Sequence, residues 1–146
     1  MVGRQGGEKV ATYELRAIGQ VESSQTDLES APRQADEGAP DAWLVFDPDI
    51  ADGLTGLRPG DEVILITWLD RARRDVLRVH PRGDTSRPQE GVFRTRSPHR
   101  PNPLGLHQVE ITAVDSGRVR VRHLDAIHGT PVIDMKLVLA EDVAKR

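Results

Sequence analysis

Cysteine is absent from the 146-residue chain, which excludes disulfides, thiolate metal ligands and thiol nucleophiles. Aromatic side chains make up only 3% of the residues, too few for a nucleic-acid binder that works mainly by stacking bases. No apolar run approaches the roughly 20 residues that a membrane-spanning helix needs. Residues 1–9 are charged and glycine-rich, so we expect a disordered leader there rather than a signal peptide. These features predict a cytoplasmic protein that does not enter a membrane.

The net charge of −3 conceals a local excess of arginine. Residues 71–100 hold nine arginines against Asp75, Asp84 and Glu90, which gives this segment a charge of +6. The planar guanidinium binds phosphate or carboxylate through paired hydrogen bonds, so the segment is a candidate anion site. A solvated, salt-bridged surface would have the same composition, and charge alone leaves both interpretations open.

Alternation of apolar and polar residues predicts short strands and little helix. Strands are predicted over residues 10–21, 42–47, 63–69, 75–79, 106–114, 118–123 and 132–139, with a helical turn at 50–57 and a short extended segment at 91–95. The run 63–69 is continuously apolar, as expected of a strand covered on both faces. The predicted strands at 106–114 and 118–123 form a hairpin across Ser116-Gly117. The pattern indicates one domain over residues 10–140, an antiparallel barrel or sandwich.

Common catalytic and phosphate-binding motifs are missing. The sequence has no glycine-rich phosphate loop after a strand, no GxSxG and no HExxH. His123 and His128 are five residues apart, but no other ligand clusters with them, so we expect no metal site. His107 lies at the head of an alternating strand and is expected to be structural. The segment 97–103, SPHRPNP, cannot be helical because of its prolines and is predicted to be a rigid loop.

One long motif identifies the chain more specifically. Residues 91–111, GVFRTRSPHRPNPLGLHQVEI, resemble the TsaA-like/TrmO family signature, approximately GVFATRSPxRPNPIGLSxVxL. The likeness continues through residues 123–136, HLDAIHGTPVIDMK, and includes the triplet at 32–34 and ADGLTGL at 51–57. On these motifs the chain is identified as a member of that family.

The resemblance implies a mainly β fold, a small antiparallel β-barrel with short helices and long loops, unlike the Rossmann sheet of most methyltransferases. It also implies a homodimer, S-adenosylmethionine as methyl donor, and methylation of N6 of N6-threonylcarbamoyladenosine beside the tRNA anticodon. Carried over by motif, the cofactor-binding residues would be Pro32, Arg33, Gln34, Arg96, Leu106, Asp125, Ala126, Ile127 and His128.

Chemistry suits these assignments. Arg33 or Arg96 can bind the donor's carboxylate, Asp125 its ammonium or ribose hydroxyls, and Leu106 its adenine face. The alternative for Arg96 is that it only braces the 97–103 loop. His128 stands where the family usually has Asp.

The N6 atom that would accept the methyl group is urea-like and must lose a proton, so a base or a polarising group would help the transfer. We expect His80 or Asp70 in this role, with Asp125 and His128 as further candidates in the motif loops. Two other functions remain open: a methyltransferase for a small molecule or another nucleoside, and an S-adenosylmethionine-binding module without catalysis.

Overall fold

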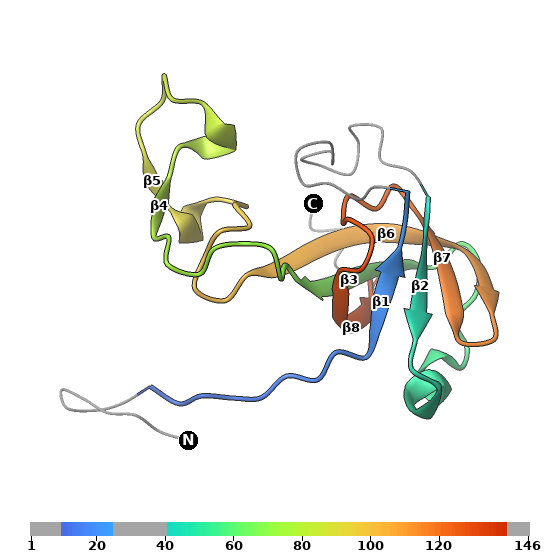
Figure 1. Cartoon of the computed structure of the whole chain (residues 1–146). Helices are drawn as coiled ribbons and strands as arrows, with labels where there is room; N and C mark the ends of the chain where they lie inside the picture. Colours follow the sequence, from blue (N-terminus) through green and yellow to red (C-terminus); the bar gives the residue numbers. More distant parts are fainter. Residues whose placement is uncertain (1–9, 25–40, 140–146) are drawn as a thin grey trace.

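Six antiparallel strands close into a barrel in the computed structural model, which describes residues 10–24 and 41–139 (Figure 1). Each strand pairs with the next around the barrel, and the last pairs back to the first. In this order the strands are β1 (Gly19–Glu22), β2 (Ala42–Phe46), β7 (Arg118–Arg122), β6 (Leu104–Asp115), β3 (Glu62–Trp68) and β8 (Pro131–Leu137). The mainly β, antiparallel barrel predicted from the sequence is therefore confirmed.

The alternating side chains fill the barrel from inside. Every strand contributes at least one completely buried apolar residue, and together these form the core: Val21, Leu44, Leu65, Ile111, Val119 and Val132. Because successive side chains of a strand point to opposite faces, the residues between them lie on the outside of the barrel. Closure gives every strand of the barrel a neighbour on each side, although β1 and β8 join through only two residue pairs.

The β6–β7 hairpin forms where the pattern predicts it. Ser116 and Gly117 occupy its turn with φ angles of 40° and 82°. Positive φ at both central residues is the requirement of the tight turn whose twist matches the two strands. Asp115 and Arg118 are the last paired residues before this turn.

Three local predictions differ from the structure. Residues 12–18 lie outside any strand, and Val10 and Tyr13 are 87% and 83% exposed, because no neighbouring strand covers them. The run 63–69 is buried on one face only, since it forms part of a barrel wall. The segment predicted to be extended at 91–95 contains a 3-10 turn, η3 (Val92–Arg94), whose Val92 is buried. The predicted helical turn at 50–57 is present as η1 (Pro48–Leu54).

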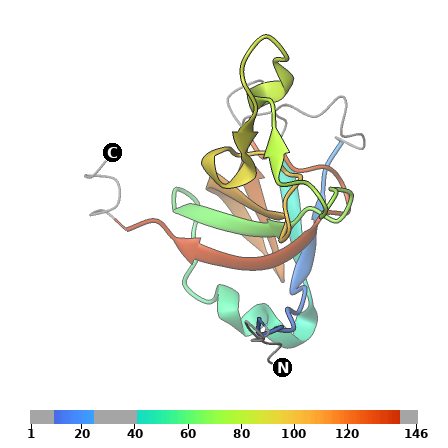
Figure 2. The ribbon, with the colours of Figure 1, turned by 90° about the vertical axis from the view of Figure 1, so that its left-hand side faces the viewer.

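An arm, defined here as residues 69–103, stands away from one end of the barrel (Figures 1 and 2). It connects β3 to β6, and it leaves and rejoins the barrel at the paired residues Trp68 and Leu104. Inside the arm, β4 (Arg78–Val79) pairs with β5 (Glu90–Gly91), and η2 (Pro81–Gly83) lies between them. The predicted strand at 75–79 is thus confirmed only at its end. No helix in the described part of the chain is long and apolar enough to cross a membrane.

Candidate functional site

A cavity of about 880 Å³ lies between the arm and the mouth of the barrel. The arm contributes residues 69–72 and several residues between 79 and 99. The barrel contributes His107, Thr130 and the loop after β7. Ligand pockets in proteins measure roughly 300–1,000 Å³, so this cavity can hold a molecule the size of a nucleoside with an amino-acid tail. Six of the predicted site residues line it: Asp70, His80, Arg96, Asp125, Ala126 and Ile127.

Arg100 fixes the proline-rich loop that forms one wall. Its guanidinium donates three hydrogen bonds of 2.8 Å, to the carbonyls of Val92, Thr95 and Ser97. The bonds leave from two different nitrogens of the planar guanidinium, Nε and one terminal nitrogen, and the single nitrogen of a lysine cannot occupy both positions. This arginine is therefore part of the arm's own structure.

Arg74 ties the start of the arm to its end. It donates to the Pro101 carbonyl at 2.7 Å and to Asn102 Oδ1 at 3.2 Å. Its guanidinium carbon also lies 5.1 Å from the centre of the Trp68 ring, within the range of a cation–π contact. Arg74 is thus engaged within the protein.

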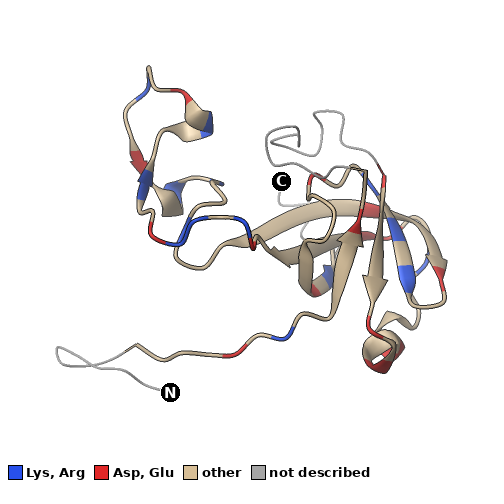
Figure 3. Cartoon of the chain, in the orientation of Figure 1, with Lys and Arg blue, Asp and Glu red and all other residues tan. Residues whose placement is uncertain are grey.

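Lys and Arg positions recur along the arm (Figure 3), and some of these arginines form ion pairs. Arg73 pairs with Asp75 and Arg94 with Glu90. The side-chain hydrogen bond from Arg73 lowers the pKa of Asp75. Arg78 and Arg87 are exposed and form no ion pair with another described residue within 4.0 Å. The arginine-rich segment is therefore partly a scaffold and partly a source of exposed positive charge.

Arg96 bridges the arm and the barrel. One of its terminal nitrogens donates to the Leu106 carbonyl at 3.0 Å, and the residue is otherwise exposed at the cavity wall. Both predicted roles are compatible with this position, because one contact leaves most of the guanidinium's donors for a ligand. The Leu106 side chain is 52% exposed and is not among the cavity's lining residues.

The loop after β7 supplies the opposite wall. Ala126 and Ile127 are 4% and 5% exposed, and the Ile127 carbonyl accepts from both the backbone and the hydroxyl of Thr130. His128 lies outside the cavity wall and accepts a hydrogen bond from the Ser23 backbone at 3.2 Å. Pro32, Arg33 and Gln34 lie outside the described residues.

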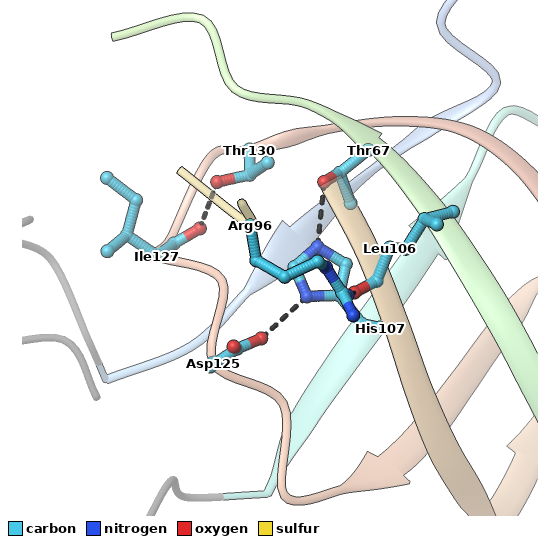
Figure 4. A network of polar contacts seen from close by, with 7 residues as sticks. All are labelled: Thr67, Arg96, Leu106, His107, Asp125, Ile127 and Thr130. Atoms are coloured by element: carbon cyan, nitrogen blue, oxygen red, sulfur yellow. Dashed lines mark hydrogen bonds and ion pairs between the residues drawn. The ribbon is translucent and has the colours of Figure 1, made fainter. Parts of the chain in front are cut away.

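Asp125 contacts His107, a residue that the sequence predicts to be structural (Figure 4). His107 Nδ1 lies 2.6 Å from Asp125 Oδ1, and Nε2 lies 2.8 Å from Thr67 Oγ1. All three belong to different elements: β6, the loop after β7, and β3. The signal available in the sequence was the glycine two residues before His107, which leaves room for the imidazole.

His80 and Asp70 both reach the cavity from the arm. His80 Nδ1 lies 2.9 Å from the Arg87 carbonyl. A carbonyl only accepts hydrogen bonds, so Nδ1 carries the proton and neutral His80 has its lone pair on Nε2. That nitrogen is the atom that can accept a proton. Among residues 10–24 and 41–139, no three His, Asp or Glu side chains are grouped to hold a metal ion.

A sequence model described as the tRNA-methyltransferase O N-terminal domain matches residues 20–141. An S-adenosyl-L-methionine-binding protein of Archaeoglobus fulgidus is 46% identical over 123 residues, covering 84% of this chain and 86% of that protein. A probable S-adenosyl-L-methionine-binding protein of Methanothermobacter thermautotrophicus is 41% identical and is covered over 87% of its length.

The solved structures that resemble this chain are of the protein family named by the sequence model. A crystal structure of TrmO from Pseudomonas aeruginosa is 27% identical, has a TM-score of 0.72, and covers 90% of this chain. A further crystal structure of TrmO is 29% identical, has a TM-score of 0.73, and covers 93%. This chain spans 58% and 62% of the lengths of those two TrmO chains.

Proposed function

The chain belongs to the tRNA-methyltransferase O N-terminal domain family, and from this and its cavity we propose that it binds S-adenosylmethionine and transfers the methyl group. The observation that carries the proposal is the meeting of Arg96, Asp125 and His80 at one cavity. These residues come from the arm and from a barrel loop, and each has the chemistry that a different part of the reaction needs.

The cavity offers partners for each end of the cofactor. The Arg96 guanidinium retains donors for a carboxylate, and Asp125 has a second oxygen for an ammonium or a ribose hydroxyl. Ala126 and Ile127 provide an apolar wall for the adenine. When bound, S-adenosylmethionine supplies an electrophilic methyl group on a sulfonium.

We propose N6 of N6-threonylcarbamoyladenosine in tRNA as the acceptor. One support is the family to which the chain belongs. The other is the exposed positive charge of Arg78 and Arg87, which can bind tRNA phosphates. In the reaction the N6 atom forms a bond to the methyl carbon, and the sulfur keeps the electrons of its broken bond. The N6 proton goes to His80 Nε2, or to Asp70 if the histidine does not reach it. Most of the acceleration comes from holding N6 roughly 3 Å from the methyl carbon.

Two observations favour alternatives in which the chain does not methylate tRNA. The curated relatives of comparable length are named as S-adenosyl-L-methionine-binding proteins, and the chain spans about three-fifths of the TrmO structures. A cofactor-binding module without catalysis, or a methyltransferase for a small molecule or another nucleoside, would fit these facts.

A homodimer is also part of the proposal. Leu77 and Phe93 on the arm are 61% and 79% exposed, an arrangement that association with a second copy would cover. Light scattering should give twice the monomer mass of 16.1 kDa at micromolar concentration. A particle of monomer mass would contradict the dimer.

The experiment that tests the function has two stages. Calorimetry should show that the purified chain binds S-adenosylmethionine with a Kd in the micromolar range, about −8 kcal/mol. The chain is then incubated with the cofactor and tRNA from cells lacking the family enzyme, and digested nucleosides are analysed by mass spectrometry. A methylated N6-threonylcarbamoyladenosine supports the proposal. Binding without product on tRNA favours the alternatives, and absence of binding contradicts both.

A further inference from the structure

The contact between Thr67, His107 and Asp125 has the residue types of a hydrolytic triad, but burial excludes that chemistry. Thr67 is 0% exposed, so its hydroxyl cannot reach a substrate. The side chains of His107 and Asp125 are 7% and 19% exposed, and both residues line the cavity. The order of burial therefore runs from the barrel interior at Thr67 toward the cavity at Asp125.

We propose that His107 is a positioning residue for the cofactor site: it fixes the Asp125 carboxylate in one orientation in the cavity wall. One carboxylate oxygen is then engaged and the other is left for a cation or hydroxyl of the ligand. This inference rests on the proposed function, because the ligand in question is S-adenosylmethionine.

The hydrogen-bond partners assign the direction of each bond. The Asp125 carboxylate can only accept, so His107 Nδ1 carries the proton and donates across 2.6 Å. Nε2 of the neutral ring then accepts from the Thr67 hydroxyl at 2.8 Å. Both ring nitrogens are satisfied, which fixes the imidazole in one tautomer and one orientation.

Gly105 makes this arrangement sterically possible. It pairs across the ladder with Thr67, and it lies two residues before His107 on the same face of β6. A Cβ at position 105 would come within 2.5 Å of Thr67 Oγ1 and 2.7 Å of His107 Nε2. The missing side chain therefore provides the space in which the ring leans toward β3.

The benefit for binding is preorganisation. Asp125 belongs to a segment without regular secondary structure, so its own backbone does not set the direction of the carboxylate. A charge-assisted hydrogen bond from a ring anchored between two strands supplies that direction before the ligand arrives. The inference predicts that His107 affects cofactor affinity through Asp125 alone.

The test is a double-mutant cycle on S-adenosylmethionine affinity, measured by calorimetry. His107→Leu should raise Kd roughly tenfold, the usual effect of losing a hydrogen bond to a charged group. In an Asp125→Ala background, His107→Leu should have no further effect on Kd. A merely structural role would weaken binding in both backgrounds, which would overturn the inference.

Conservative variants keep the test valid if His107→Leu does not fold. The amide nitrogen of Asn lies near the position of imidazole Nδ1, so His107→Asn should retain most of the affinity. Thr67→Val should raise Kd by roughly threefold, because the ring keeps its bond to Asp125 but loses its other anchor. His123→Asn is the matched control: His123 is exposed, has φ = 62°, which Asn tolerates, and does not line the cavity.

The outcomes separate the two proposals. A wild-type chain that binds no S-adenosylmethionine overturns the proposed function, and the inference with it. Wild-type affinity that is unchanged by His107→Leu overturns the inference alone. Nitrogen-15 NMR of the His107 ring gives an independent check: a protonated Nδ1 supports the bond to Asp125, and a protonated Nε2 with bare Nδ1 contradicts it.

Discussion

The imidazole of His80 donates from Nδ1 to the Arg87 carbonyl 2.9 Å away, so the lone pair of the neutral ring lies on Nε2. His80→Asn should preserve the donor and remove the base. We expect turnover to fall by about 10²–10⁴-fold with cofactor affinity unchanged, as measured by methyl incorporation and calorimetry. Undiminished turnover would assign the base to Asp70 or to solvent.

Arg96 should contribute to affinity through the carboxylate of the cofactor. Arg96→Ala is expected to weaken S-adenosylmethionine binding by about 1.5–3 kcal/mol, the range for a hydrogen bond to a charged group. Affinity for 5′-methylthioadenosine, which lacks the amino-acid tail, should not change. Arg58→Ala is the control, since Arg58 is exposed and does not line the cavity. Equal losses for both ligands would leave Arg96 as a brace of the arm.

Arg100 should govern the rigidity of the arm. Arg100→Lys keeps the charge, but its single nitrogen cannot take the places of both Nε and the terminal nitrogen that bond the three carbonyls. Amides of residues 92–100 should exchange faster, corresponding to about 1–3 kcal/mol less protection, while β6 and β7 amides stay unchanged as the internal control. Hydrogen exchange followed by mass spectrometry measures this. Uniform loss of protection would mean that Arg100 supports the whole fold.

The exposed arginines of the arm should determine the salt dependence of RNA binding. Replacing Arg78 and Arg87 with Gln should flatten the log–log salt slope for an anticodon stem-loop by about 1.4–1.8, if each contacts one phosphate. Arg120 and Arg122, which pair with Asp41 and Glu110 on the barrel, give the matched double replacement with no expected change. Salt-insensitive binding in the unmodified chain would remove tRNA as the preferred acceptor.

Asp84 provides a titration test of the arm's structure. The Ser86 hydroxyl and backbone donate to it at 2.6 and 3.0 Å, and they lower the pKa of Asp84 below its ordinary value of 3.8. A lowered folded-state pKa stabilises the fold above the unfolded-state value, and this contribution is lost as pH falls through the folded-state value. Ser86→Ala should raise the pKa of Asp84 in an NMR titration. An unmoved titration would mean that the Ser86 hydroxyl does not bond to Asp84 in solution.

The barrel was predictable because each of its strands has a local sequence pattern. Val119 and Val121 alternate with arginines, and Ser116-Gly117 has the residue types of a tight turn, so the hairpin needs no distant contact to be recognised. The segment 10–18 also alternates, yet it is not a strand, because strand formation depends on a partner that the pattern does not encode. Likewise, the burial of Val92 in η3 depends on how the arm folds, which the local sequence does not encode.

The site was predictable by resemblance more than by pattern. Asp125, Ala126 and Ile127 came from the family motif and do line the cavity, while the only local signal for the contact of His107 was Gly105, which does not identify a partner. Its contacts join positions 40 residues apart at Thr67 and 18 apart at Asp125, and such pairings follow from barrel closure. Sequence alternation placed His107 correctly on a strand but could not reveal its partners.

The arm enters and leaves the barrel at two residues that are already paired, Trp68 and Leu104. The entropy of closing such a loop grows only with the logarithm of its length, by about 0.6 kcal/mol for each doubling. Lengthening or shortening the arm therefore changes the stability of the barrel little. The length of this segment, and with it the shape of the cavity, can therefore vary while the six-stranded framework and the Asp125 wall stay in place.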